Sequence, residues 1–138
     1  QMALITAAVA NSGEIMRPYL LESVHGPSGE PLFRTAPGSW LTAMKPRSAA
    51  VIRDAMVKTV REGTGTNAAI PGTTVAGKTG SAQNPHGDAH AWFVAFAPAE
   101  NPRIAVAVIV ENGGTGGRAA APIAREIIRE ELKSPVRP

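Results

Sequence analysis

The side chains best suited to chemistry gather in one short segment, residues 75–83, which reads VAGKTGSAQ. This segment holds one ammonium group, on Lys78, and two hydroxyl groups, on Thr79 and Ser81. A cation beside hydroxyl donors suits a ligand that carries a carboxylate or a polarised carbonyl. The glycines between them remove side chains where a ligand or a second backbone would come close. We therefore expect this segment to border a binding site.

One known use of such a segment is a phosphate-binding loop, because residues 72–79 (GTTVAGKT) fit the pattern G-x-x-x-x-G-K-[ST]. That pattern binds nucleotides only where a buried strand precedes it and a helix begins at the lysine. Here Ile70–Gly72 is typical of a turn, and Thr73–Ala76 favours a strand. The residues after Lys78 include glycines and Asn84-Pro85, which do not start a helix. A nucleotide-binding fragment is therefore the less favoured alternative.

A Lys-Thr-Gly triplet, here Lys78 to Gly80, is also a signature of serine acyltransferases that react with penicillin. The triplet is followed by a turn and then by residues 88–98 (DAHAWFVAFAP). It is preceded by residues 61–66 (REGTGT) and by residues 1–20. This ordered set resembles the carboxy-terminal part of the D,D-transpeptidase domain of high-molecular-weight, class B-like penicillin-binding proteins. The resemblance runs from about residue 1 to residue 132.

This resemblance implies an α/β fold of the α+β type: an antiparallel sheet with flanking helices, β-lactamase/transpeptidase-like and incomplete in this chain. The other two family signatures, Ser-x-x-Lys and Ser-x-Asn, do not occur in the sequence and are expected upstream of Gln1. Residues 1–138 would then be the carboxy-terminal part of the domain. The isolated chain would be inactive, whereas the parent protein would be a serine-type enzyme of cell-wall synthesis.

The resemblance also implies roles for four residues. The Lys78 ammonium would lie near the serine nucleophile and attract the terminal carboxylate of a D-Ala-D-Ala stem peptide or of a β-lactam. The Thr79 hydroxyl would hydrogen-bond the same carboxylate, and Gly80 would let the substrate backbone lie along the strand. The backbone N–H of Ser81 would be one donor of the oxyanion hole. Lys78 and Ser81 are thus the catalytic candidates, in a site that needs no cofactor and no metal.

Two further interpretations stay open at this stage. His86, Asp88 and His90 alternate at strand spacing and could present three ligands to a metal ion, although a polar loop beside the cleft fits them better. In addition, a non-catalytic sensor or binding domain for β-lactams would use the same scaffold. The sequence upstream of Gln1 would discriminate this sensor from the enzyme.

Composition narrows the function classes. The 138 residues are 43% hydrophobic and 4% aromatic, enough for one domain whose core rests on aliphatic side chains. The net charge of +3 is scattered along the chain, so no nucleic-acid face is expected. No apolar run is long enough to span a membrane. The resemblance implies that the parent works at the extracytoplasmic face of the bacterial membrane, anchored by an upstream segment.

Hydrophobic patterning predicts the elements that must position the site. The run at 104–110 (IAVAVIV) is apolar throughout, which is typical of a strand buried on both faces. We expect this strand to have an open edge that is covered by the missing half of the domain or by another copy. Residues 34–44 are expected to be irregular. Helices are predicted at 2–10, 45–62 and 119–132, the last with an apolar face of Ile123, Ile127, Ile128 and Leu132 that can cover a sheet. Strands are predicted at 19–24, 32–33, 73–83, 91–97 and 103–111, with a hairpin-like turn at 26–29 between the first two.

Overall fold

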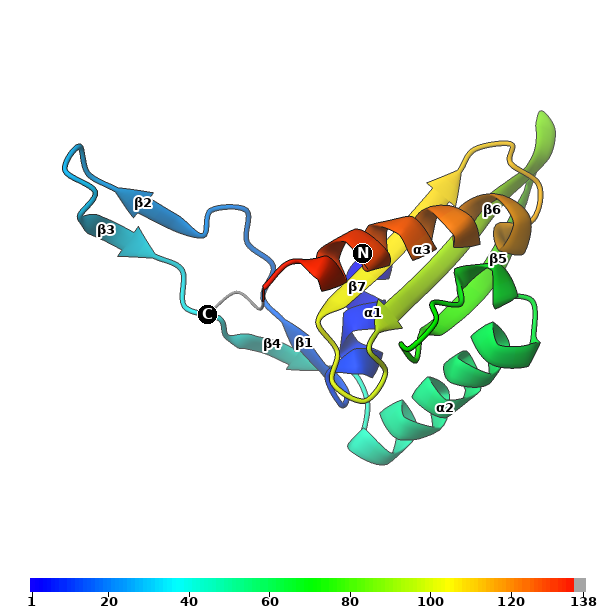
Figure 1. The fold of residues 1–138 in the computed structure, drawn as a ribbon, viewed down its shortest axis with the longest axis horizontal. Helices are drawn as coiled ribbons and strands as arrows, with labels where there is room; N and C mark the ends of the chain where they lie inside the picture. The colour runs from blue at the N-terminus through cyan, green and yellow to red at the C-terminus, as the bar shows by residue number, and fades with distance from the viewer. Residues whose placement is uncertain (136–138) are drawn as a thin grey trace.

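The computed structural model describes residues 1–135 and consists of a compact body from which a narrow arm projects (Figure 1). The body is built on a three-stranded antiparallel sheet in the order β5-β6-β7. The body strands are β5 (Ala76–Asn84), β6 (Gly87–Ala97) and β7 (Ile104–Val110), and the helices are α1 (Met2–Ala10), α2 (Pro46–Glu62) and α3 (Gly116–Lys133).

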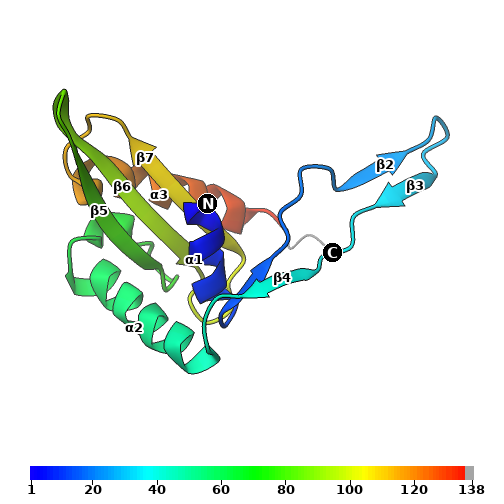
Figure 2. The same cartoon turned by 180° about the vertical axis from the view of Figure 1, so that it is seen from behind.

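Helices cover both faces of this sheet. Helix α3 packs on β6 and β7 from one side, where Phe93 and Ile128 are fully buried in one apolar cluster. Helix α1 lies on the opposite face (Figure 2), where Val9 joins Phe96 in a second cluster. Helix α2 runs beside β5 and contributes Val60 to the first of these clusters. The sheet is therefore the central layer that positions everything else.

The open edge expected on the last strand is present, because β7 ends the strand order of the described residues. Ile109 on this strand keeps 45% of its surface exposed. The sequence assigned only the carboxy-terminal helix to this sheet and left its second face to a missing partner. Helix α1 in fact covers part of that face, where Val9 packs with Phe96.

Local signals place α2 where the sequence predicts it. Pro46 occupies the first turn, where its missing N–H is not needed, and Gly63 follows the last helical residue. Helix α3 begins earlier than expected, at Gly116, and its buried face also differs. The pattern predicted one apolar face with Ile123, Ile127, Ile128 and Leu132. Ile128 is fully buried and Leu132 packs against the core as predicted, but Ile123 and Ile127 are 44% and 43% exposed. The residues buried on α3 are Gly116, Ala120, Ala121, Ala124 and Ile128.

The arm consists of two short antiparallel ribbons. The expected hairpin around residues 26–29 is present between β2 (Ser23–His25) and β3 (Pro31–Arg34), although the first strand does not begin at residue 19 as predicted. A second ribbon pairs β1 (Glu14–Met16) with β4 (Ser39–Thr42). The prediction that residues 34–44 are irregular is therefore wrong for β4, although residues 35–38 are irregular as expected. Strand β4 pairs with a segment far back in the chain, and no local pattern reveals that pairing.

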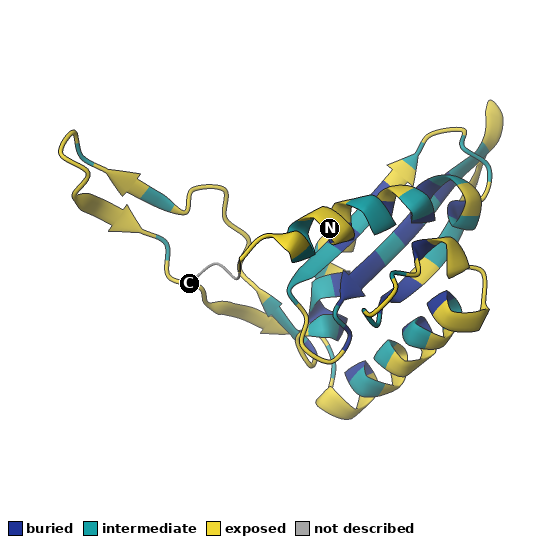
Figure 3. Cartoon of the chain, in the orientation of Figure 1, coloured by how far each residue is buried: buried dark blue, intermediate teal, exposed yellow. Residues whose placement is uncertain are grey.

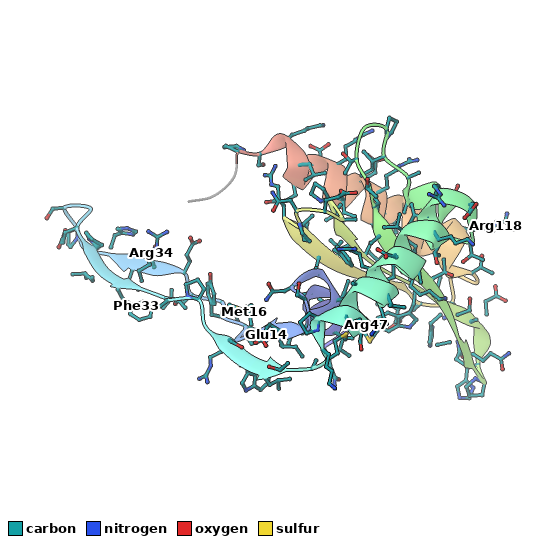
Figure 4. The ribbon with its side chains drawn as sticks, turned by 90° about the horizontal axis from the view of Figure 1, so that it is seen from below. Glu14, Met16, Phe33, Arg34, Arg47 and Arg118 are labelled. Carbon is teal, nitrogen blue, oxygen red and sulfur yellow. The ribbon has the colours of Figure 1, made fainter. Side chains whose placement is uncertain are left out.

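Burial follows this division. Dark blue residues concentrate on the sheet and on the helix faces against it, whereas the arm is almost entirely exposed (Figure 3). Figure 4 shows Glu14 on the part of the arm next to the body, and Phe33 and Arg34 farther out. Glu14 joins the two strands of its ribbon, because its carboxylate accepts hydrogen bonds from the hydroxyls of Ser39 and Thr42. These two bonds lower the pKa of Glu14, Ser39 contributing most.

Candidate active-site wall on strand β5

The four predicted site residues lie in succession along β5, an edge strand of the sheet as far as the chain is described. Lys78 pairs with Val94 of β6, and Gly80 pairs with Trp92. Thr79 and Ser81 pair with Phe93 and Ala91, so their side chains leave from the other face. Lys78 and Thr79 would thus reach a ligand on the outer side of β5 from opposite faces of the sheet.

A pocket of about 310 Å³ lies against this strand. Helix α1 and strand β6 provide its apolar part, and β5 provides the charge of Lys78. The pocket is lined by Met2, Lys78, Thr79, Gly80, Trp92 and Val94. A larger hollow of about 510 Å³ lies between α2 and the turn after β6, but it contains none of the predicted site residues.

The Lys78 side chain is exposed, and its Nζ donates a hydrogen bond of 2.7 Å to the carbonyl oxygen of Thr79. Within residues 1–135, no carboxylate forms an ion pair with Lys78. Its charge is therefore available to an anion that approaches the outer side of β5.

The hydroxyl of Thr79 has a partner that the sequence did not indicate. Its Oγ1 lies 2.7 Å from Oγ1 of Thr64, a residue of the short loop after α2. In the sequence, residues 61–66 contribute to the family resemblance, and Thr64 carries no predicted role. The position of Thr64 between Gly63 and Gly65 was the available signal of a functional hydroxyl. No local pattern indicates which strand this hydroxyl contacts.

The start of α3 completes the surroundings of this pair. A Cβ added to Gly116 would stand 1.9 Å from the Trp92 carbonyl oxygen and 2.7 Å from that of Gly80. A Cβ on Gly117 would stand 2.2 Å from the Thr64 carbonyl oxygen. Only glycines allow the helix to begin this close to the sheet and the loop.

Two glycines of β5 have different reasons for their lack of a side chain. A Cβ on Gly77 would meet the Phe93 ring at 2.5 Å and Val60 at 3.0 Å. The glycine at this position is therefore required by core packing, not by the approach of a ligand. A Cβ on Gly80 would meet only the Trp92 Cβ, at 3.2 Å. Of the two, Gly80 is the one that leaves room beside the pocket.

Two alternative interpretations of this region, the nucleotide-binding loop and the three-ligand metal site, are wrong. Lys78 lies inside a strand and opens no helix, so residues 72–79 are not a nucleotide-binding loop. Among the described residues, no three His, Cys, Asp or Glu side chains are placed to hold a metal ion. His90 instead accepts a hydrogen bond at Nδ1 from the backbone N–H of Asn112, which ties the β5–β6 hairpin to the loop after β7.

An antiparallel sheet between helices, with Lys-Thr-Gly on its edge strand, is the β-lactamase/transpeptidase-like fold. The family model described as penicillin binding protein transpeptidase domain matches residues 1–129. Peptidoglycan D,D-transpeptidase PbpA of Mycolicibacterium smegmatis is 43% identical over 144 residues, covering 96% of this chain and 29% of PbpA. Peptidoglycan D,D-transpeptidase MrdA of Acinetobacter baumannii is 33% identical over 165 residues, covering 100% of this chain and 23% of MrdA. This chain belongs to the penicillin-binding protein transpeptidase domain family.

Solved structures agree with this assignment. Penicillin-binding protein A from Mycobacterium tuberculosis, in its ceftriaxone acyl-enzyme complex, superposes with a TM-score of 0.86 at 42% identity, over 94% of this chain and 31% of that one. The D,D-transpeptidase domain of a peptidoglycan glycosyltransferase from Eggerthella lenta gives a TM-score of 0.85 at 41% identity, over 96% and 31% of the two chains. The chain thus spans less than a third of the length of these relatives. Across residues 1–135, no helix has both the length and the apolar character needed to cross a membrane.

Proposed function

We propose that this chain forms the Lys-Thr-Gly wall of a peptidoglycan D,D-transpeptidase whose serine nucleophile lies in sequence upstream of Gln1. The observation that carries the proposal is the placement of Lys78, Thr79 and Gly80 together on an exposed strand edge, beside a pocket whose lining contains no carboxylate within residues 1–135. An acyl-enzyme complex with ceftriaxone in a relative of 42% identity supports β-lactams as ligands of the same wall.

In this proposal the substrate is a stem peptide that ends in D-Ala-D-Ala. Its carboxylate binds the Lys78 ammonium and the Thr79 hydroxyl, while its backbone runs along the outer edge of β5 next to Gly80. The serine hydroxyl attacks the carbonyl of the penultimate D-Ala, the terminal D-alanine leaves, and the acyl group passes from serine to an amine of a neighbouring stem peptide. A β-lactam forms the same ester by opening of its ring.

Ser81 has the oxyanion role. Its backbone N–H would stabilise the negative charge that develops on the attacked carbonyl oxygen, together with a second N–H from the nucleophile segment. Loss of one such donor costs on the order of 3 kcal/mol of transition-state stabilisation in well-studied acyl transfer. A site on the extracytoplasmic face of the bacterial membrane, reached through an upstream anchor, completes the proposal.

The test uses a protein that contains this chain together with its upstream sequence, labelled with a fluorescent penicillin. The wild type should become covalently labelled, the isolated chain should not, and Lys78→Ala should label at least tenfold more slowly because the anchoring cation is lost. Lys58→Ala is the matched control, since Lys58 lies on the exposed side of α2 and pairs with Glu62 at 3.8 Å. Equal labelling of Lys78→Ala and wild type would refute the role of Lys78.

A non-catalytic β-lactam sensor would use the same wall, so labelling alone does not discriminate the two functions. The two functions are discriminated by incubating the unlabelled protein with a D-Ala-D-Ala stem peptide and an acceptor amine. The transpeptidase releases D-alanine and forms the cross-linked product, whereas the sensor forms neither.

A further inference from the structure

We infer that Thr64 is a positioning residue for Thr79: its hydroxyl donates a hydrogen bond to Thr79 and thereby directs the only hydrogen of Thr79 towards a ligand carboxylate. This inference rests on the proposed function of β5 and adds to it a residue from outside the Lys-Thr-Gly triplet. The observation behind it is the 2.7 Å separation of the two Oγ1 atoms, across fifteen positions of sequence.

The direction of this hydrogen bond follows from counting hydrogens. A threonine hydroxyl carries one hydrogen and accepts through its lone pairs, whereas a carboxylate only accepts. When Thr79 donates to a carboxylate, it has no hydrogen left for Thr64, so Thr64 must be the donor between them. The chain Thr64 to Thr79 to carboxylate then runs in one direction, and each bond polarises the next.

The backbone around Thr64 is held in place independently of this bond. Gly63 and Gly65 both donate through N–H to the carbonyl oxygen of Thr59, at 3.1 and 3.0 Å, which fixes the loop at the end of α2. On the far side, the Asn67 side chain donates to the carbonyl oxygen of Gly117 at 2.8 Å. The Thr64 hydroxyl is thus presented by a tied loop, as positioning requires.

The inferred role differs from simple packing. Thr64 is exposed and does not belong to either buried apolar cluster. Replacement by valine keeps the branched shape and removes the hydroxyl, both donor and acceptor, whereas replacement by serine keeps the hydroxyl. The two variants therefore separate a hydrogen-bonding role from a steric one.

The experiment measures the second-order rate of acylation in the protein that contains this chain and its upstream sequence. Two probes are compared: a penicillin with a free carboxylate and the methyl ester of the same penicillin. Thr64→Val should slow acylation by the free acid roughly threefold to tenfold, the range expected for one neutral hydrogen bond. Acylation by the ester should slow less, because the uncharged ester carbonyl accepts the directed hydrogen bond more weakly than a carboxylate does.

Three further measurements make the outcome decisive. Thr64→Ser should restore the rate with the free acid to near the wild-type value. In a Thr79→Val background, Thr64→Val should cause no additional loss, because the two residues act as one unit. Thr66→Val is the control, since Thr66 is an exposed threonine of the same segment whose side chain makes none of the hydrogen bonds described above.

The possible results separate the role of Thr64 from the proposed function. An unchanged rate for Thr64→Val, or an equal loss with acid and ester, overturns the inference while wild-type acylation still supports the proposed function. A wild type that no penicillin acylates overturns the proposed function, and the inference falls with it. Thermal unfolding midpoints of all variants are recorded alongside, so that a loss caused by unfolding shows as a lower midpoint and an equal loss with both probes.

Discussion

Gly117 lies so close to Thr64 that a Cβ on Gly117 would stand 2.2 Å from the Thr64 carbonyl oxygen. Real atoms do not approach to this distance, so any other residue at position 117 must push the loop and helix α3 apart. The contact joins two segments far apart in the chain, and the hydroxyl of Thr64 reaches Thr79 from this loop. The geometry of the proposed carboxylate site therefore depends on a glycine outside it.

The first prediction concerns this contact. Gly117→Ala should displace Thr64 and slow acylation by a free-acid penicillin about as much as Thr64→Val does, roughly threefold to tenfold. The gain in helix propensity from alanine, about 1 kcal/mol, does not offset a clash with backbone. Stopped-flow acylation with a chromogenic β-lactam measures the effect. Gly38→Ala is the control, because a Cβ there has no neighbouring atom of the described residues within 4 Å.

The second prediction concerns the packing of β5 against the core. Gly77→Ala should destabilise the fold by about 1–3 kcal/mol, the usual range for overpacking, because its Cβ would stand 2.5 Å from the Phe93 ring. Urea unfolding of the domain measures the free energy of unfolding. A change within about 0.5 kcal/mol of wild type would show that Phe93 moves aside easily, contrary to its fully buried position.

The third prediction concerns the buried face of α3. Ile128→Ala removes a fully buried side chain and should cost about 2–5 kcal/mol of unfolding free energy. Ile127→Ala is the matched control, since this neighbour keeps 43% of its surface exposed and should cost far less. Equal losses for the two variants, measured by the same unfolding assay, would contradict the orientation of α3 on the sheet.

The fourth prediction concerns the pH dependence of the arm. Hydrogen bonds from Ser39 and Thr42 lower the folded-state pKa of Glu14, so the folded arm favours the charged form. The contribution of Glu14 is therefore complete above its unfolded pKa, near 4.3 in model peptides, and is lost as pH falls through its lower folded value. NMR titration of the Glu14 side-chain carboxyl should show a midpoint below that of a model peptide.

Two variants test the cause of that shift. Ser39→Ala should move the Glu14 midpoint back up towards the peptide value, because Ser39 supplies the largest contribution. Ser28→Ala, which changes a serine at the far hairpin of the arm, should leave the midpoint where it is. A midpoint that does not respond to Ser39→Ala would show that the hydroxyl does not donate to Glu14 in solution.

Local chemistry decided several parts of this protein in advance. Helix α2 begins at Pro46 and ends before Gly63, as the sequence predicts, because capping and breaking signals act within one helical turn. The β-branched and glycine-containing segment around Lys78 predicts a strand, and the apolar run at 104–110 predicts another strand of the buried sheet. The resemblance around Lys78, Thr79 and Gly80 led to the family, which the comparisons confirm. The catalytic and binding roles of these residues stay predictions.

Other features exist only once the chain is folded. The pairing of β1 with β4, the approach of Thr64 to Thr79 and the contact of Gly117 with Thr64 all join segments that lie far apart in sequence. The helical pattern pointed to isoleucines on α3, yet only Ile128 of the three is buried, and alanines fill the rest of the buried face because close approach to the sheet favours small side chains. The sequence by itself determined which elements form, since their signals are local. Only the tertiary structure decided which surfaces meet, because that depends on the path of the whole chain.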